Sequence, residues 1–221
     1  MHRRFADRRE AGRELARRLG VLDAKRTVVF ALPRGGVPVA FEIAAANRCP
    51  LDLLLVRKIG VPGRRELALG AIVGGEPPVT VVNRDIAESL GIGEERIAAL
   101  AAPELDEIAR QSARYGEGVP RDLKGKTAIV VDDGLATGAT ARAALEALRQ
   151  RGAARTILAV PVAPRGALED FAGLADEVIC LAQPEPFVSV SRAYEDFDQV
   201  DDEDVAALLA QARAQAPMNR G

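Results

Sequence analysis

Short runs of apolar residues alternate along the chain with segments that have the periodicity or the capping residues of helices. Strands are predicted for the mainly apolar runs at 27–32, 51–56, 128–131, 156–162 and 177–181, and the first is continuous, as in a parallel strand that is buried on both faces. Helices are predicted at 7–19, 37–47, 141–151 and 201–213, with a shorter one at 164–173. This alternation predicts an α/β fold, in which a mostly parallel central sheet is flanked by helices.

The middle of the chain departs from this alternation. Residues 59–66 are rich in Gly and Pro and have neither period, which predicts either a plain surface loop or a lid that closes over a site. Strands are expected at 69–73 and 79–82, joined in a hairpin by the Gly and Pro residues between them. Residues 83–125 are predicted to form a mostly helical insertion that covers one face or contributes to a dimer contact.

Composition limits the classes of function. The chain has 221 residues, enough for one α/β domain, and a formal net charge of −2, which gives no overall basic field for nucleic acid. Because no apolar run reaches membrane-spanning length and no signal peptide is evident, a cytoplasmic protein without membrane contact is expected. The only histidine is His2, which argues against a Ser-His-Asp triad and against a histidine-based zinc site.

The most informative stretch is Thr127–Thr140. Its apolar strand ends at two adjacent acids, Asp132 and Asp133, and a loop of small and hydroxyl residues leads into the next helix. The N–H groups and the dipole of a helix N-terminus favour an anion, and Gly134 and Gly138 let a ligand approach the backbone. The sequence therefore predicts a phosphate site beside two carboxylates that suit sugar hydroxyls or a cation. Two solvated acids that cap a helix are the alternative.

A second phosphate site is predicted where the first strand ends. Residues 33–36, Pro-Arg-Gly-Gly, form a turn before a helix, so that the two glycines expose N–H groups and Arg34 supplies a guanidinium. A plain strand-to-helix turn with a surface arginine is the alternative. Arg57 and Lys58 follow the second predicted strand at its carboxyl end, where open α/β sheets bind ligands.

Together these motifs resemble those of the type I phosphoribosyltransferases, and most closely a bacterial group within that family. Val130–Thr140 is similar to the family's motif for 5-phosphoribosyl 1-diphosphate (PRPP), Leu32–Ala40 to its pyrophosphate loop, and Arg57–Gly63 to the segment leading into its flexible catalytic loop. The resemblance covers nearly the whole chain. It implies the family's fold with a small hood: a core at 21–183 that includes the insertion at 83–125, with segments 1–20 and 184–221 packed on that core.

The resemblance also implies roles for individual residues. The ribose of PRPP would be held by Asp132 and Asp133, which would also hold Mg²⁺ indirectly, and the pyrophosphate by Pro33, Arg34, Gly35 and Gly36. The 5′-phosphate would lie against Gly134, Leu135, Ala136, Thr137, Gly138, Ala139 and Thr140. Catalytic roles would fall to Arg57, Lys58 and Glu66, and a base would stack on the hood residues Phe187 or Tyr194. The family's cis peptide bond would fall at Leu32–Pro33, where proline lowers the free energy of the cis form.

The implied reaction is transfer of the phosphoribosyl group from PRPP to a nitrogen acceptor, typically a nucleobase, with Mg²⁺ as cofactor and release of pyrophosphate. Ala136 stands where the enzymes for 6-oxopurines carry an acid near the purine N7, so adenine or another small acceptor is favoured over hypoxanthine and guanine. Glu66 is then the candidate proton acceptor, or only a solvated loop acid. A homodimer is expected. Two alternatives stay open: a regulator that binds PRPP without turnover, and an enzyme that hydrolyses or phosphorolyses a nucleotide on the same fold.

Overall fold

A five-stranded parallel sheet forms the centre of the molecule in the computed structural model, which describes residues 4–61, 63–115 and 123–215 and omits the side chains of residues 65 and 66. The strand order is β2-β1-β6-β7-β8. Their bounds are β1 Thr27–Ala31, β2 Leu51–Leu53, β6 Thr127–Val131, β7 Arg155–Val162 and β8 Glu177–Ala182. The predicted α/β fold with a mostly parallel sheet is confirmed.

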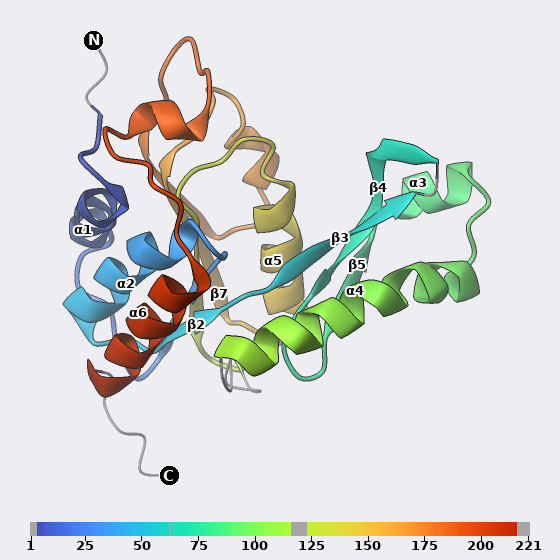
Figure 1. The fold of residues 1–221 in the computed structure, drawn as a ribbon, viewed down its shortest axis with the longest axis horizontal. Helices are drawn as coiled ribbons and strands as arrows, with labels where there is room; N and C mark the ends of the chain where they lie inside the picture. Colours follow the sequence, from blue (N-terminus) through green and yellow to red (C-terminus); the bar gives the residue numbers. More distant parts are fainter. Residues whose placement is uncertain (1–3, 62, 116–122, 216–221) are drawn as a thin grey trace.

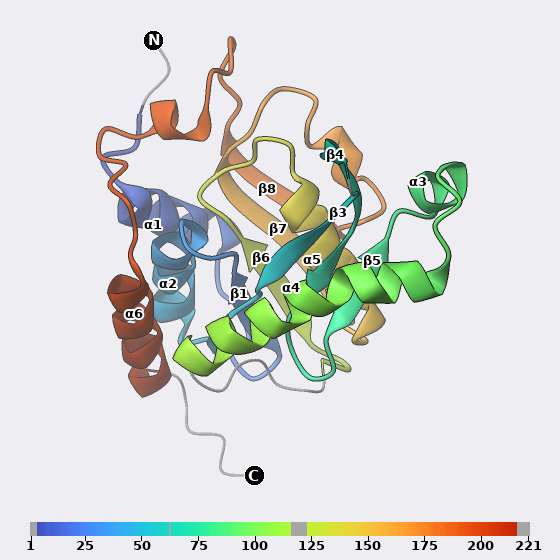
Figure 2. The same cartoon turned by 45° about the vertical axis from the view of Figure 1, so that its right-hand side comes forward.

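Helices cover both faces of this sheet, because alternate residues of each strand point to opposite sides. On one face, strand residues such as Val29 and Ile129 pack against α1 (Arg8–Leu19), α2 (Gly36–Asn47) and α6 (Asp202–Gln215). On the other face, strand residues such as Phe30 and Val130 pack against α5 (Ala139–Gln150). Figures 1 and 2 show α1, α2 and α6 together on one side of the sheet and α5 on the other.

A second, antiparallel sheet projects from the central one, at the right of Figure 1. Its strands are β3 (Val56–Val61), β4 (Arg64–Val73) and β5 (Val79–Val82), and two helices follow, α3 (Arg84–Ser89) and α4 (Glu94–Tyr115). The predicted hairpin of residues 69–73 and 79–82 is confirmed, and the helices predicted within 83–125 are α3 and α4. This unit has its own small core, which includes Ile59, Leu69 and Ile108.

Two sequence predictions were wrong in this region. The strand expected at 51–56 ends at Leu53, and Val56 already belongs to β3 of the other sheet. Most of the loop expected at 59–66 belongs to the end of β3 and the start of β4. Residue 62 lies outside the described residues. The strand was hidden because Gly60 interrupts the apolar alternation, and the register of the β3–β4 pair shifts on both sides of that glycine.

The C-terminal part of the chain contributes a hood beside the ends of the central strands. The short helix expected at 164–173 is only a 3₁₀ turn, η1 (Glu169–Phe171), and a second turn, η2 (Val190–Ala193), lies in the hood. The N-terminal segment pairs with it: Phe5 N donates to Ala193 O at 2.8 Å, and Glu195 N donates to Phe5 O at 2.8 Å. The two terminal segments therefore form one structure, while the division at 21–183 stays a prediction.

Candidate functional site

The two predicted phosphate-binding loops come together because the strands that carry them are neighbours. Strands β1 and β6 pair in parallel from Thr27 with Thr127 to Ala31 with Val131, so both chains leave the sheet at the same edge. Residues 33–36 follow β1 and the acid pair Asp132-Asp133 follows β6. This edge, at the carboxyl ends of the strands, is where open α/β sheets bind ligands.

Two glycines allow the loops to touch. A Cβ atom added to Gly35 would lie 2.1 Å from Oδ2 of Asp133, and one added to Gly36 would lie 2.6 Å from the carbonyl oxygen of Val131. Any side chain at either position would collide with the acid loop or with the strand before it. The first loop therefore packs against the acid loop and the end of β6 without room for a side chain at either glycine.

The cis peptide bond of the first loop lies one residue later than predicted. The structure places it at Pro33–Arg34 and not at Leu32–Pro33. The prediction relied on the low energy of a cis bond before proline.

The adjacent acids differ in their surroundings. Asp133 N donates to Asp132 Oδ1 at 2.9 Å, which turns the Asp132 side chain back toward the loop. Burial, followed by the negative charge of Asp133, raises the pKa of Asp132 well above its ordinary value. Carboxyl groups on two adjacent residues can attract hydroxyl donors or a cation, and this role of the pair stays a prediction.

Asp133 is held by Arg8, which the sequence interpretation missed, and by Tyr194, for which it predicted another role. Arg8 Nε donates to Asp133 Oδ2 at 2.8 Å, and the two side chains are only 11% and 15% exposed. The Tyr194 hydroxyl donates to the carbonyl oxygen of Asp133 at 2.5 Å. One signal for Arg8 was present in the sequence: it follows the helix cap Asp7, and a cation in the first turn opposes the helix dipole.

The loop predicted to bind the 5′-phosphate divides into an anchored part and an exposed part. Leu135 is buried and its N–H donates to the carbonyl oxygen of Val162 at 2.8 Å, while Gly134 packs directly against Val162 and Val190. Gly138 has a φ of 71° and precedes α5. The residues exposed or half-exposed at this helix N-terminus are Ala136, Thr137, Gly138, Ala139 and Thr140. They present N–H and hydroxyl donors for an anion.

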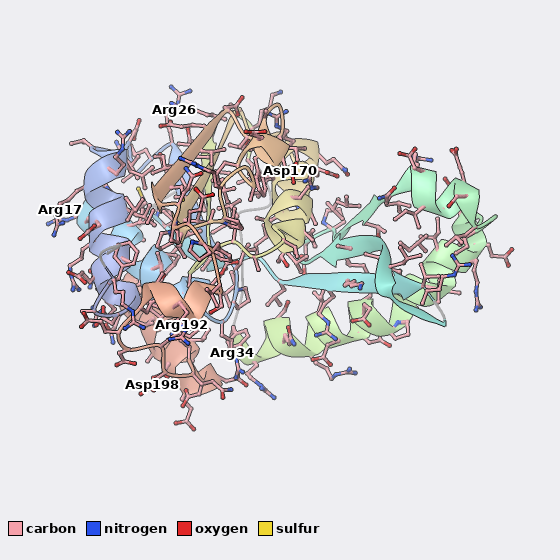
Figure 3. All side chains as sticks on the ribbon, turned by 90° about the horizontal axis from the view of Figure 1, so that it is seen from above. Arg17, Arg26, Arg34, Asp170, Arg192 and Asp198 are labelled. Carbon is pink, nitrogen blue, oxygen red and sulfur yellow. The ribbon has the colours of Figure 1, made fainter. Side chains whose placement is uncertain are left out.

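The Arg34 side chain reaches the start of α6. Its Nη1 lies 3.7 Å from Oδ1 of Asp202, and its side chain is 42% exposed. Asp202 also accepts from the Tyr115 hydroxyl at 2.6 Å and pairs with Arg114 at the end of α4. In Figure 3, Arg34 lies between the layer of α6 and the near end of α4.

The remaining predicted site residues are placed elsewhere or lie outside the description. Arg57 is on β3, where its Nε donates to Glu104 of α4 at 2.8 Å, and Lys58 is exposed on the same strand. The backbone of Glu66 belongs to β4, but its side chain lies outside the described part of the structure. The structure thus pairs Arg57 with α4 instead of with either loop.

The two hood aromatics differ. Phe187 is half-buried in the segment before η2. The Tyr194 ring is only 1% exposed and packs between Phe5 and Phe197, at 5.7 Å and 5.2 Å between ring centres. Tyr194 therefore offers no free face to a base in this structure, and its hydroxyl serves the acid loop.

No group of three or more His, Cys, Asp or Glu side chains within residues 4–61, 63–115 and 123–215 is arranged to hold a metal by itself. The donors present at the site are the two carboxylates of Asp132 and Asp133. Mg²⁺ commonly binds through one or two carboxylates, several waters and substrate phosphates. The acid pair therefore fits a Mg²⁺ ion that arrives with a phosphorylated substrate.

Comparison with known proteins agrees with the resemblance seen in the sequence. The sequence profile of the phosphoribosyl transferase domain matches residues 7–194. A Mycobacterium tuberculosis H37Rv protein, whose name assigns it provisionally to the phosphoribosyl transferases, is 47% identical over 209 residues, or 94% of this chain and 47% of that protein. The chain thus spans about half the length of the curated relatives that it matches in this way.

Two further similarities come from Thermus thermophilus. Its bifunctional protein PyrR is 33% identical over 144 residues, which are 61% of this chain and 72% of PyrR. The crystal structure of its protein TT1426 has a TM-score of 0.81 and 40% sequence identity, and the similarity covers 94% of this chain and 98% of that one. The arrangement of elements described above is therefore shared with a solved structure over nearly its whole length.

Proposed function

Because the chain belongs to the phosphoribosyl transferase domain family, we propose that it transfers the 5-phosphoribosyl group from PRPP to a nitrogen acceptor. The observation that carries the proposal is the meeting of the two loops at one edge of the sheet, with Gly35 directly against Asp133. A diphosphate on the first loop and a 5′-phosphate on the second would leave the ribose over the acid pair. PRPP has its charged groups in this order.

The proposed roles follow from the chemistry of each group. The carboxylates of Asp132 and Asp133 accept hydrogen bonds from the ribose hydroxyls, and the guanidinium of Arg34 binds the diphosphate oxygens. The donors at the start of α5 hold the 5′-phosphate. With both ends fixed, the bond from ribose C1 to the diphosphate oxygen breaks while the acceptor nitrogen bonds to C1 and releases its proton. Positioning of PRPP is then the main contribution of these residues.

Mg²⁺ is the proposed cofactor, and Asp132 and Asp133 are the residues that would hold it, directly or through water. When bound, the ion neutralises charge on the diphosphate and so makes it a better leaving group. Arg57 and Lys58 of β3 are proposed to add positive charge beside the diphosphate when the antiparallel sheet moves toward the two phosphate-binding loops. Phe187 is proposed to stack on the acceptor.

Our first prediction tests the acid pair. Replacing both residues, Asp132→Asn with Asp133→Asn, is expected to weaken PRPP binding at least about a hundredfold, because each lost charge-assisted hydrogen bond contributes roughly 1.5–3 kcal/mol. Titration calorimetry with PRPP and Mg²⁺ measures the dissociation constant. The matched control is Asp85→Asn with Glu88→Gln, two exposed acids of α3.

A folded acid-pair variant that binds PRPP as tightly as the control would contradict the proposed site. Activity is tested separately, by incubating the unchanged chain with PRPP, Mg²⁺ and single nucleobases and detecting nucleotide and pyrophosphate. Formation of a nucleotide identifies the acceptor. Binding of PRPP without a nucleotide product from any base would instead support the alternative of a regulator that does not turn PRPP over.

We propose the regulator as the second candidate, because a relative at 33% identity carries the name bifunctional protein PyrR, and a second function beside transfer is what that name states of the relative. Hydrolysis or phosphorolysis of a nucleotide would use the same residues, and release of a free base from a nucleotide would reveal it.

None of the helices in the described residues combines the length and apolar character needed to cross a membrane. We further propose that the protein acts in the cytoplasm, as a homodimer and without nucleic acid.

A further inference from the structure

The first helix contributes an arginine to the acid loop, and this arginine is placed against its local preferences. Arg8 is the first residue of α1, where a cation opposes the helix dipole, and its side chain is only 11% exposed. Arginine is seldom buried this far unless it is paired, and a buried ion pair is weak evidence for a stabilising role. Stability alone therefore does not account for an arginine at this position.

The contacts of Arg8 define an orientation for Asp133. Arg8 Nε donates to Asp133 Oδ2 at 2.8 Å, on the side of the carboxylate that also faces Gly35. A Cβ atom at Gly35 would lie 2.1 Å from Oδ2 and 3.2 Å from Oδ1. The carboxylate is thus fixed through Oδ2, with Oδ1 on the side away from the glycine.

The guanidinium is itself fixed by the hood. Its carbon lies 3.7 Å from the centre of the Phe197 ring, and Nη1 donates to the carbonyl oxygen of Asp198 at 2.8 Å. Tyr194, whose hydroxyl donates to the Asp133 carbonyl, packs on the same Phe197 ring. The hood therefore holds Asp133 twice, through its side chain by way of Arg8 and through its backbone by way of Tyr194.

We propose that Arg8 is a positioning residue for PRPP: held on the Phe197 ring, it orients the Asp133 carboxylate so that the ribose hydroxyls meet a fixed acceptor. This inference rests on the proposed function of the acid pair. The hood then has two roles, contact with the acceptor and orientation of Asp133. Hood residues 194–198 and Arg8 act on the ribose through Asp133.

The test compares two neighbouring arginines of the same helix. Arg8→Gln removes the guanidinium that pairs with Asp133, and Arg9→Gln removes one that pairs with Glu42 of α2 at 2.6 Å. Titration calorimetry with PRPP and Mg²⁺ is expected to give a dissociation constant about tenfold or more higher for Arg8→Gln, the loss expected for one charged hydrogen bond, and an unchanged value for Arg9→Gln. Thermal unfolding of both variants reports any general loss of structure.

Arg8→Lys is the second variant. Its ammonium keeps the charge but cannot both stack on Phe197 and donate to Asp133 and Asp198 in the fixed geometry of a guanidinium, so partial recovery of PRPP affinity is expected. In steady-state assays, KM for PRPP should rise more than kcat falls. Equal PRPP affinity of folded Arg8→Gln and Arg9→Gln overturns this inference and leaves the proposed function standing. Failure of the unchanged chain to bind PRPP overturns both.

Discussion

Gly35 shows how a residue without a side chain determines the geometry of this site. Its φ is −60°, a value that any residue adopts, so glycine is not required there for conformational freedom. Close approach is the reason, because an added Cβ would lie 2.1 Å from Oδ2 and 2.6 Å from Cγ of Asp133. Any larger residue has to displace the carboxylate that Arg8 holds.

Gly35→Ala is therefore expected to weaken PRPP binding about tenfold or more, through loss of the ordered Asp133 acceptor. The change should cost little stability, because the displaced atoms are the end of a side chain and the backbone conformation suits alanine. Titration calorimetry gives the affinity and thermal unfolding gives the stability. Gly93→Ala is the matched control, since no atom lies within 4 Å of a Cβ added there. Equal affinity of the two variants would show that the contact with Asp133 is unimportant for binding.

Among the elements, those that carry the two loops were predictable and the antiparallel sheet was not. Strands β1 and β6 are uninterrupted apolar runs because they are buried on both faces, and each is followed at once by its loop and helix. Strand β3 lacks this pattern. Its only buried residues are Ile59 and Val61, Gly60 separates them, and Arg57 and Lys58 come before them. Periodicity within a strand does not show which sheet the strand joins.

The contacts of the acid loop were hidden for a different reason. Arg8 and Asp133 are 125 residues apart in the sequence, and Tyr194 reaches the same loop from 61 residues away. Local patterns pointed to the acid pair because the residue types expected of a phosphate-binding loop lie within one short segment. They contain no information on which distant side chains will pair with it, because that depends on how the hood and α1 pack on the sheet.

The contact between β3 and α4 makes the prediction for Arg57 more specific. Its partner Glu104 is on α4, and the two side chains are 40% and 28% exposed. A pair this exposed contributes at most about 1 kcal/mol, so Arg57 can exchange Glu104 for a diphosphate at little cost. Arg57→Gln is expected to raise KM for PRPP about tenfold, whereas Glu104→Gln, which keeps the arginine, should leave it unchanged or lower it. Equal effects of the two changes would mean that the pair only joins β3 to α4.

At the scale of the whole molecule, the residues proposed to act on PRPP and the acceptor lie on three separate units. The edge of the central sheet supplies the loops, the antiparallel sheet carries Arg57 and Glu66, and the hood carries Phe187. The hood is fastened to the N-terminal segment through the backbone bonds of Phe5 and Ala6, with Ala6 accepting from Asp196 N at 2.9 Å. Choice of the acceptor is thus expected to depend on residues of all three units, which are distant from one another in the sequence.

The final prediction concerns that choice. Ala136 is exposed on the loop that follows the acid pair, and alanine cannot accept or donate a proton. The resemblance to the family implies that the enzymes for 6-oxopurines carry an acid at this position. Any proton acceptor has to come from another unit, and Glu66 on β4 is the proposed one. We therefore expect little or no nucleotide from hypoxanthine or guanine with PRPP, and more from adenine or another small acceptor. Glu66→Gln should lower kcat with the true acceptor at least about tenfold while leaving PRPP affinity unchanged, because general base catalysis contributes typically 10²–10⁴-fold. Efficient formation of guanine nucleotide by the purified protein, abolished by Asp132→Asn, would show instead that the loop does not need an acid.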